Sequence, residues 1–211
     1  MSESIAEILI KIESVKFSFK NHFLLTSGLK SPVYIDCRKI ISFVEERNFI
    51  INKAISYFKE NKINFDLVAG GETAGIPYAA FIAEKINKPM IYIRKKNKGF
   101  GRNKQIEGDF NKKNSAILIE DLATDGGSKI IFVKAMRDAG IEIKDIFVIF
   151  YYDIFEFSKS KLSKLDVNIH SLCTWKDIIK VIERNNIYNN KEIDHLKEFL
   201  SNPEKWRERN A

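Results

Sequence analysis

Apolar and polar positions follow two different periods along this chain, and each period predicts a different element. Short apolar runs of strand length recur from residue 66 onward, and segments with helical spacing separate them. The predicted strands are 66–69, 90–93, 115–119, 146–151 and 167–172. The predicted helices are 43–58, 74–86 and 128–139, with a short helical piece near 155–163. Strands separated by helices imply right-handed crossovers, so we predict an α/β fold with an open parallel sheet.

The two ends of the chain have less regular patterns. Residues 4–17 have helical spacing, and two short strands follow at 23–25 and 33–35, joined by the turn-rich segment 27–32. From Trp175 onward the spacing predicts two helices. We therefore expect one domain over 1–211. It has an N-terminal hood of about 1–42, an α/β core at 43–173 and C-terminal helices at 174–211.

Composition narrows the class of protein. The 211 residues are 45% hydrophobic and 30% charged, which is typical of a globular protein, and no apolar run is long enough to span a membrane. The N-terminus lacks the pattern of a signal peptide. Cys37 and Cys173 lie far apart, which favours buried thiols in a reducing cytoplasm. Three histidines without a cysteine cluster argue against a transition-metal site.

The net charge of +7 admits nucleic acid or polyphosphate as a partner. The densest basic segment is 94–104, with six cations in eleven residues. It begins a stretch, 95–113, with no predicted element, and a loop of that length is typically functional. A solvated basic hairpin is the alternative interpretation.

An anion-binding pattern lies between the strand at 115–119 and the helix at 128–139. Glu120 and Asp121 follow the strand, and the small-residue loop 123–128 leads into the helix, whose apolar face is predicted to carry Ile131 and Met136. Backbone N–H groups of such a loop and the helix N-terminus attract a phosphate. The two acids suit sugar hydroxyls, so the pattern indicates a ribose-phosphate site. An ordinary strand-to-helix turn is the alternative.

Ligands of open parallel sheets bind beyond the carboxyl ends of the strands. The predicted topology brings three segments to that edge: 70–73 after one strand, the basic segment from Arg94 after the next, and the acids at 120–121 after the third. Their placement after successive strands favours one shared site.

Four stretches together resemble the orotate phosphoribosyltransferases, a branch of the type I phosphoribosyltransferases. They are 27–38 (SGLKSPVYIDCR), 70–77 (GGETAGIP), 94–108 and 119–128 (IEDLATDGGS). The resemblance extends from about Phe23 to Phe150 and implies the type I phosphoribosyltransferase fold. It also implies transfer of ribose 5-phosphate from phosphoribosyl diphosphate to orotate. The implied cofactor is Mg²⁺, held mainly through the diphosphate with no dedicated protein ligands. The implied assembly is a homodimer that shares its catalytic loop, with neither nucleic acid nor a membrane as partner.

The resemblance also implies roles for particular residues. Lys98 and Asp121 are expected to be catalytic. Those expected to bind phosphoribosyl diphosphate are Gly70, Gly71, Glu72, Arg94, Lys95, Lys98, Glu120, Asp121, Leu122, Ala123, Thr124, Asp125, Gly126, Gly127 and Ser128. Those expected to contact orotate are Lys30, Tyr34 and Thr124.

The chain departs from the family pattern at three positions. Thr26 replaces a lysine, Phe100 replaces a histidine of the catalytic loop, and Ile154 replaces an arginine that holds orotate. The last change keeps open a phosphoribosyltransferase for another base. A non-catalytic RNA-binding regulator on the same fold is the alternative from a different class.

Overall fold

A six-stranded sheet forms the centre of the computed structural model, which describes residues 2–25, 28–96, 105–124, 127–154 and 161–210. The strand order is β10-β9-β8-β5-β6-β7, and neighbours are parallel except for the antiparallel pair β6–β7. The strands are β5 (Leu67–Gly71), β6 (Met90–Ile93), β7 (Ile106–Glu107), β8 (Ser115–Ala123), β9 (Glu142–Tyr151) and β10 (Asn168–Thr174). The predicted open parallel sheet is confirmed. The prediction that 95–113 contains no element was wrong, because β7 lies within it.

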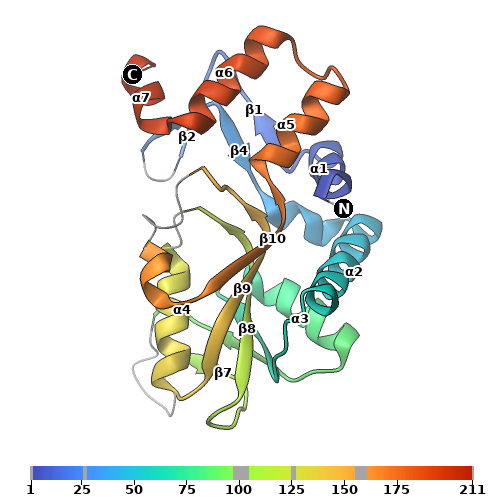
Figure 1. Cartoon of the computed structure of the whole chain (residues 1–211), viewed down its shortest axis with the longest axis vertical. Helices are drawn as coiled ribbons and strands as arrows, with labels where there is room; N and C mark the ends of the chain where they lie inside the picture. The colour runs from blue at the N-terminus through green and yellow to red at the C-terminus, as the bar shows by residue number, and fades with distance from the viewer. Residues whose placement is uncertain (1, 26–27, 97–104, 125–126, 155–160, 211) are drawn as a thin grey trace.

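Helices cover both faces of this sheet (Figure 1). On one face lie α2 (Val44–Glu60) and α3 (Gly75–Ile86), and on the other lies α4 (Gly127–Asp138). The side chains of β8 alternate accordingly. Ile117 and Ile119 belong to the apolar cluster around α2 and α3, whereas Leu118 belongs to the cluster around α4. This two-sided burial explains why the strand is apolar throughout.

The apolar face of α4 differs from the predicted one. Ile131 is exposed, whereas Phe132, Val133 and Met136 are fully buried against the sheet. The helix is rotated by about one residue relative to our expectation, since positions i, i+3 and i+4 share a helical face.

The hood contains more elements than its sequence predicted. They are α1 (Ser2–Lys11), β1 (Val15–Phe17), β2 (Phe23–Leu24), β3 (Lys30–Ser31), β4 (Val33–Ile35) and the 3-10 helix η1 (Cys37–Ser42). The helix expected over 4–17 ends at Lys11, where Ser14 N–H donates to Leu9 O and the chain turns. The two predicted strands do not pair with each other: β2 pairs with β3, and β4 pairs with β1.

Three helices, not two, follow the sheet: α5 (Trp175–Arg184), α6 (Asn190–Ser201) and α7 (Pro203–Arg209). Pro203 cannot continue α6 because it lacks an N–H group, and Asn202 caps α7 by accepting from Lys205 N–H. These helices lie at the same end of the molecule as the hood (Figure 1). The short helical piece predicted near 155–163 is η3 (Lys161–Leu165) in its described part, and 155–160 lie outside the described residues.

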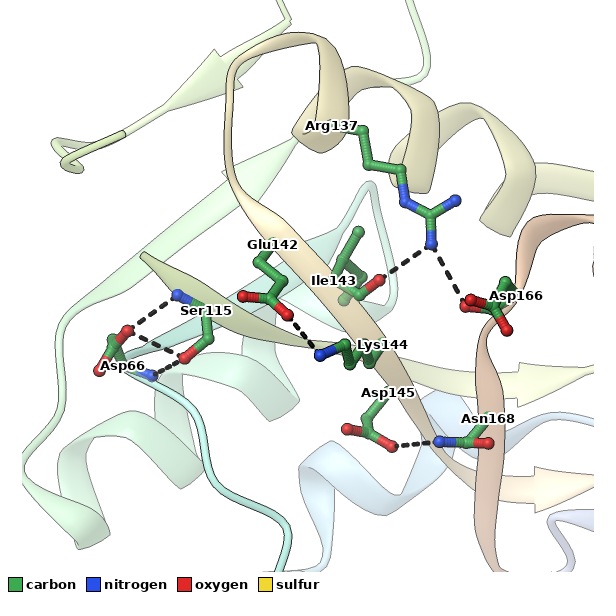
Figure 2. A network of polar contacts seen from close by, with 9 residues as sticks. All are labelled: Asp66, Ser115, Arg137, Glu142, Ile143, Lys144, Asp145, Asp166 and Asn168. Atoms are coloured by element: carbon green, nitrogen blue, oxygen red, sulfur yellow. Dashed lines mark hydrogen bonds and ion pairs between the residues drawn. The ribbon is translucent and has the colours of Figure 1, made fainter. Parts of the chain in front are cut away.

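Polar contacts tie the amino-terminal ends of the strands together (Figure 2). The carboxylate of Asp66, just before β5, accepts from Ser115 N–H (2.8 Å) and Ser115 Oγ (2.9 Å) at the start of β8. Asn168 Nδ2 donates to Asp145 Oδ1 between β10 and β9. Arg137 of α4 donates to Ile143 O (3.0 Å). These contacts fix strand register at the edge opposite the candidate site. No helix in the described ranges is long and apolar enough to cross a membrane.

Candidate active site

The two predicted acids lie inside β8 rather than after it. Hydrogen-bonded pairing with β9 continues through Leu122 and Ala123, so the strand extends four residues beyond the predicted end at Ile119. Glu120 is 5% exposed and Asp121 is 8% exposed. Leu122 and Ala123, expected in a phosphate loop, therefore also belong to the strand. The acids form the floor of a site, and the loop begins only at Thr124.

A cavity of about 440 Å³ opens at this end of the sheet, between the strands and the hood. Its lining residues are Tyr34, Ile35, Asp36, Arg38, Glu72, Thr73, Ala74, Lys95, Glu120, Asp121, Leu122, Thr124, Gly127, Ser128 and Lys129. Nine of the predicted site residues are among them. The structure thus brings the three predicted segments together and adds a fourth wall from the hood.

Other predicted residues lie elsewhere or outside the described ranges. Lys30 Nζ donates to Asn210 O (3.2 Å) on the C-terminal segment. Arg94 Nε donates to Glu107 Oε1 (2.9 Å), and its guanidinium packs over the ring of Tyr92. Lys98, Asp125, Gly126, Thr26 and Phe100 lie outside the described residues. The roles of all of these stay predictions.

Gly70 and Gly71 lie within β5, where close packing explains both glycines. A Cβ atom on Gly71 would lie 2.3 Å from Glu120 Oε1 and 2.6 Å from Phe132 Cε2. A Cβ atom on Gly70 would lie 2.9 Å from the Cα atom of Ile76 in α3. Only glycine allows the Glu120 carboxylate and α3 to approach the strand this closely.

Lys129 is a buried cation at the site that the sequence analysis missed. Its ammonium donates to Glu120 Oε2 (2.8 Å) and to Leu122 O (2.6 Å). A signal was present: Lys129 stands three, four and seven residues before Phe132, Val133 and Met136, so helical spacing places it on the buried face of α4. A lysine on an apolar helix face needs a buried partner, and the nearest acids in the chain are those of β8.

Burial and neighbouring charges act on the acids in opposite directions. Burial raises the pKa values of Glu120 and Asp121, and the Lys129 ammonium opposes the rise at both. On the hood, Arg38 forms two hydrogen bonds to Asp36 and lowers the pKa of that carboxyl group.

The described lining carries more negative than positive groups. The cations are Arg38, Lys95 and Lys129, and the carboxylates are Asp36, Glu72, Glu120 and Asp121. Glu72 Oε2 accepts from Lys95 N–H (2.7 Å), which fixes the start of the basic segment beside the cavity. A polyanionic ligand would meet a repulsive field here unless further cations accompany it.

The position of the missing arginine lies away from the cavity. Asp153 is paired with Lys176 of α5 (2.9 Å), and Ile154 packs against the apolar cluster. The arginine that does line the cavity is Arg38 of the hood, which the sequence analysis did not assign to the site.

Solved structures with the same architecture define the class of protein. The chain superposes on orotate phosphoribosyltransferase from Aeropyrum pernix with a TM-score of 0.72 at 26% identity, covering 88% of this chain and 99% of that one. It matches Leishmania donovani UMP synthase with a TM-score of 0.78 at 25% identity, over 94% of this chain and 42% of that one. The fold and the cavity are those of a type I phosphoribosyltransferase.

Curated sequences narrow the class to one family. The chain is 44% identical over 212 residues to orotate phosphoribosyltransferase of Roseobacter denitrificans, which covers 100% of this chain and 94% of that protein. Its identity to the Rhizobium rhizogenes enzyme of the same name is 42% over 213 residues, covering 100% and 92%. The chain belongs to the orotate phosphoribosyltransferase family. No family model matches the chain.

Proposed function

We propose that the cavity binds phosphoribosyl diphosphate together with Mg²⁺ and transfers its ribose 5-phosphate group to N1 of orotate. The products are orotidine 5′-monophosphate and pyrophosphate, so the reaction is a late step of UMP synthesis. The observation that carries the proposal is the junction of β8 and α4, where two buried acids lie next to a helix N-terminus within one cavity.

The residues at this junction suit the two ends of a ribose 5-phosphate group. Gly127 and Ser128 begin α4, where free backbone N–H groups and the helix dipole attract the 5′-phosphate. Glu120 and Asp121 then accept hydrogen bonds from the 2′- and 3′-hydroxyl groups. The acids thereby fix the ribose while C1 exchanges pyrophosphate for the base.

Mg²⁺ fits the charge of the cavity. The four described carboxylates disfavour a diphosphate on its own, and a hard, oxygen-seeking cation bound to that diphosphate removes the repulsion. The ion would be held through diphosphate oxygens and water. When bound, it stabilises the negative charge that develops on the leaving pyrophosphate.

Cationic side chains complete the proposed site. Lys95 borders the cavity, and the resemblance places Lys98 over the diphosphate from the partner subunit of a homodimer. Arg38 supplies a cation for the carboxylate of orotate in place of the arginine missing at 154, with Tyr34 and Thr124 beside it. Orotate N1 attacks as an anion, so no general base is needed. We place the enzyme in the cytoplasm.

The direct test measures orotate consumption by ultraviolet absorbance with phosphoribosyl diphosphate, with and without Mg²⁺. Loss of orotate that depends on Mg²⁺, with an equal release of pyrophosphate, is the expected result. Turnover of a purine or of uracil with no turnover of orotate would establish the second candidate, a phosphoribosyltransferase for another base. Ile154 is the observation that keeps this candidate in view.

A further inference from the structure

The Lys129–Glu120 ion pair is the most deeply buried charge pair of the site. The two side chains are 8% and 6% exposed, and their atoms Nζ and Oε2 lie 2.8 Å apart. Lys129 Nζ also donates to Leu122 O at 2.6 Å and lies 3.4 Å from Ser128 Oγ. An ammonium group has three N–H donors, and these three oxygens account for all of them. Lys129 is therefore committed to the protein and has no donor left for a phosphate.

The second oxygen of Glu120 is confined by backbone. Glu120 Oε1 is buried and has no hydrogen-bond partner among the described residues. Glycines surround it: a Cβ atom on Gly71 would lie 2.3 Å away, and one on Gly75 would lie 2.7 Å away. With Oε2 held by Lys129 and Oε1 against this glycine wall, the carboxylate has one available orientation.

The charges around Glu120 come from every wall of the cavity. Asp121 is the next residue of β8, and Glu72 follows β5; both disfavour a second negative charge. Lys95 follows β6, and Arg38 with Asp36 lies on the hood. Of the described cations, Lys129 is the one in contact with the carboxylate. Removing it would leave a buried acid beside another acid, and such an acid takes up a proton.

We propose that Lys129 is a positioning residue that keeps Glu120 ionised and correctly oriented for the ribose hydroxyl groups, and that it does not itself bind phosphate. The ligand part of this inference rests on the proposed function, whereas the ionisation of Glu120 can be measured without any substrate. A neutral glutamic acid would lose one acceptor and rotate freely toward the solvent side of the cavity. Binding of phosphoribosyl diphosphate should then depend on pH through Glu120.

The test compares Lys129→Met and Lys129→Gln with the conservative Lys129→Arg, and adds Glu120→Gln alone and combined with Lys129→Met. The first measurement is the titration of the Glu120 carboxyl carbon by NMR in the free protein. In Lys129→Met we expect its midpoint to rise by about one pH unit or more. An unchanged midpoint would overturn the proposal, whether or not the protein proves to use orotate. Should Lys129→Met fail to fold, Lys129→Gln carries the same comparison.

The second measurement is the affinity for phosphoribosyl diphosphate with Mg²⁺ by calorimetry between pH 5.5 and 8.5. Lys129→Met should bind about tenfold more weakly at neutral pH and recover as pH rises, since one pH unit in the midpoint is a tenfold effect. Lys129→Arg should restore most of the affinity. The double variant should bind no more weakly than Glu120→Gln. A double variant weaker than either single variant, with a loss that is equal at every pH, would show that Lys129 binds phosphate directly.

Discussion

Gly71 illustrates how a single missing side chain shapes the site. A methyl group there would overlap Glu120 Oε1 and the ring of Phe132, so Gly71→Ala must displace the carboxylate that the site uses. We expect affinity for phosphoribosyl diphosphate to fall about tenfold or more, with a stability loss of about 1–3 kcal/mol from overpacking. Calorimetry and urea unfolding measure the two effects.

Gly140 provides the matched control. It ends α4 with a φ of +87°, where the nearest atom to a new Cβ is Lys112 Cγ at 3.4 Å. Gly140→Ala should cost about 1–2 kcal/mol of stability through the left-handed backbone alone, and should leave substrate affinity unchanged. Equal losses of affinity in the two variants would contradict a specific role for Gly71.

Residue by residue, sequence patterns located the acids but not their partner. Glu120 and Asp121 followed an apolar run and preceded a glycine loop, which is enough to predict a sugar-phosphate site. Lys129 was overlooked because a lysine at the start of a helix is ordinarily solvated. Arg38 was quoted within a motif without a role, since a pattern along the chain does not show that the hood folds over the sheet.

At the scale of elements, His22 joins the hood to the C-terminal helices. Its ring packs edge-on against Trp206 of α7 at 4.7 Å between centroids and stacks with His195 of α6 at 5.8 Å. Burial lowers the pKa of His22, and nearby His195 and Lys30 lower it further. The folded protein therefore holds His22 neutral over a pH range in which the unfolded chain binds a proton.

This shift gives the sign of a pH effect on stability. Between the ordinary histidine pKa of 6.5 and the lowered folded value, the unfolded state binds more protons, so stability falls as pH falls through that range. His22→Gln should reduce the drop in melting temperature between pH 7.5 and 5.5. His170→Gln on β10 is the matched substitution outside this junction. If both variants flatten the profile equally, His22 is not the source.

Elements were predicted best where the sheet is continuous and least well where tertiary contacts decide. The five parallel strands and three flanking helices carry strong periods and were found with small errors at their ends. β8 ran past its predicted end because β9 continues to pair with it, although the sequence becomes acidic there. The hood strands are two or three residues long and depend on partners that local patterns do not reveal.

At the scale of the whole molecule, the proposed homodimer makes a complementation prediction. If Lys98 of one subunit serves the cavity of its partner, Lys98→Ala and Asp121→Ala each abolish most turnover as pure proteins. Mixed dimers then contain one intact site and should recover up to about half of the wild-type activity per intact site formed. Turnover is measured after mixing and confirmed subunit exchange. No recovery in verified mixed dimers would place the loop lysine in its own subunit's site.

The short antiparallel strand at the sheet edge also affects how these molecules avoid one another. An exposed edge strand offers free N–H and C=O groups on which another chain can pair and begin aggregation. Here β7 pairs only with Tyr92 and Ile93, and the chain then turns at Gly108, whose φ is +102° and whose Cβ position lies 3.1 Å from Met90 O. The two-residue strand and this turn together cover the edge of β6. A second molecule thus finds too short a ladder to extend, which keeps a strand-rich protein dispersed at high concentration.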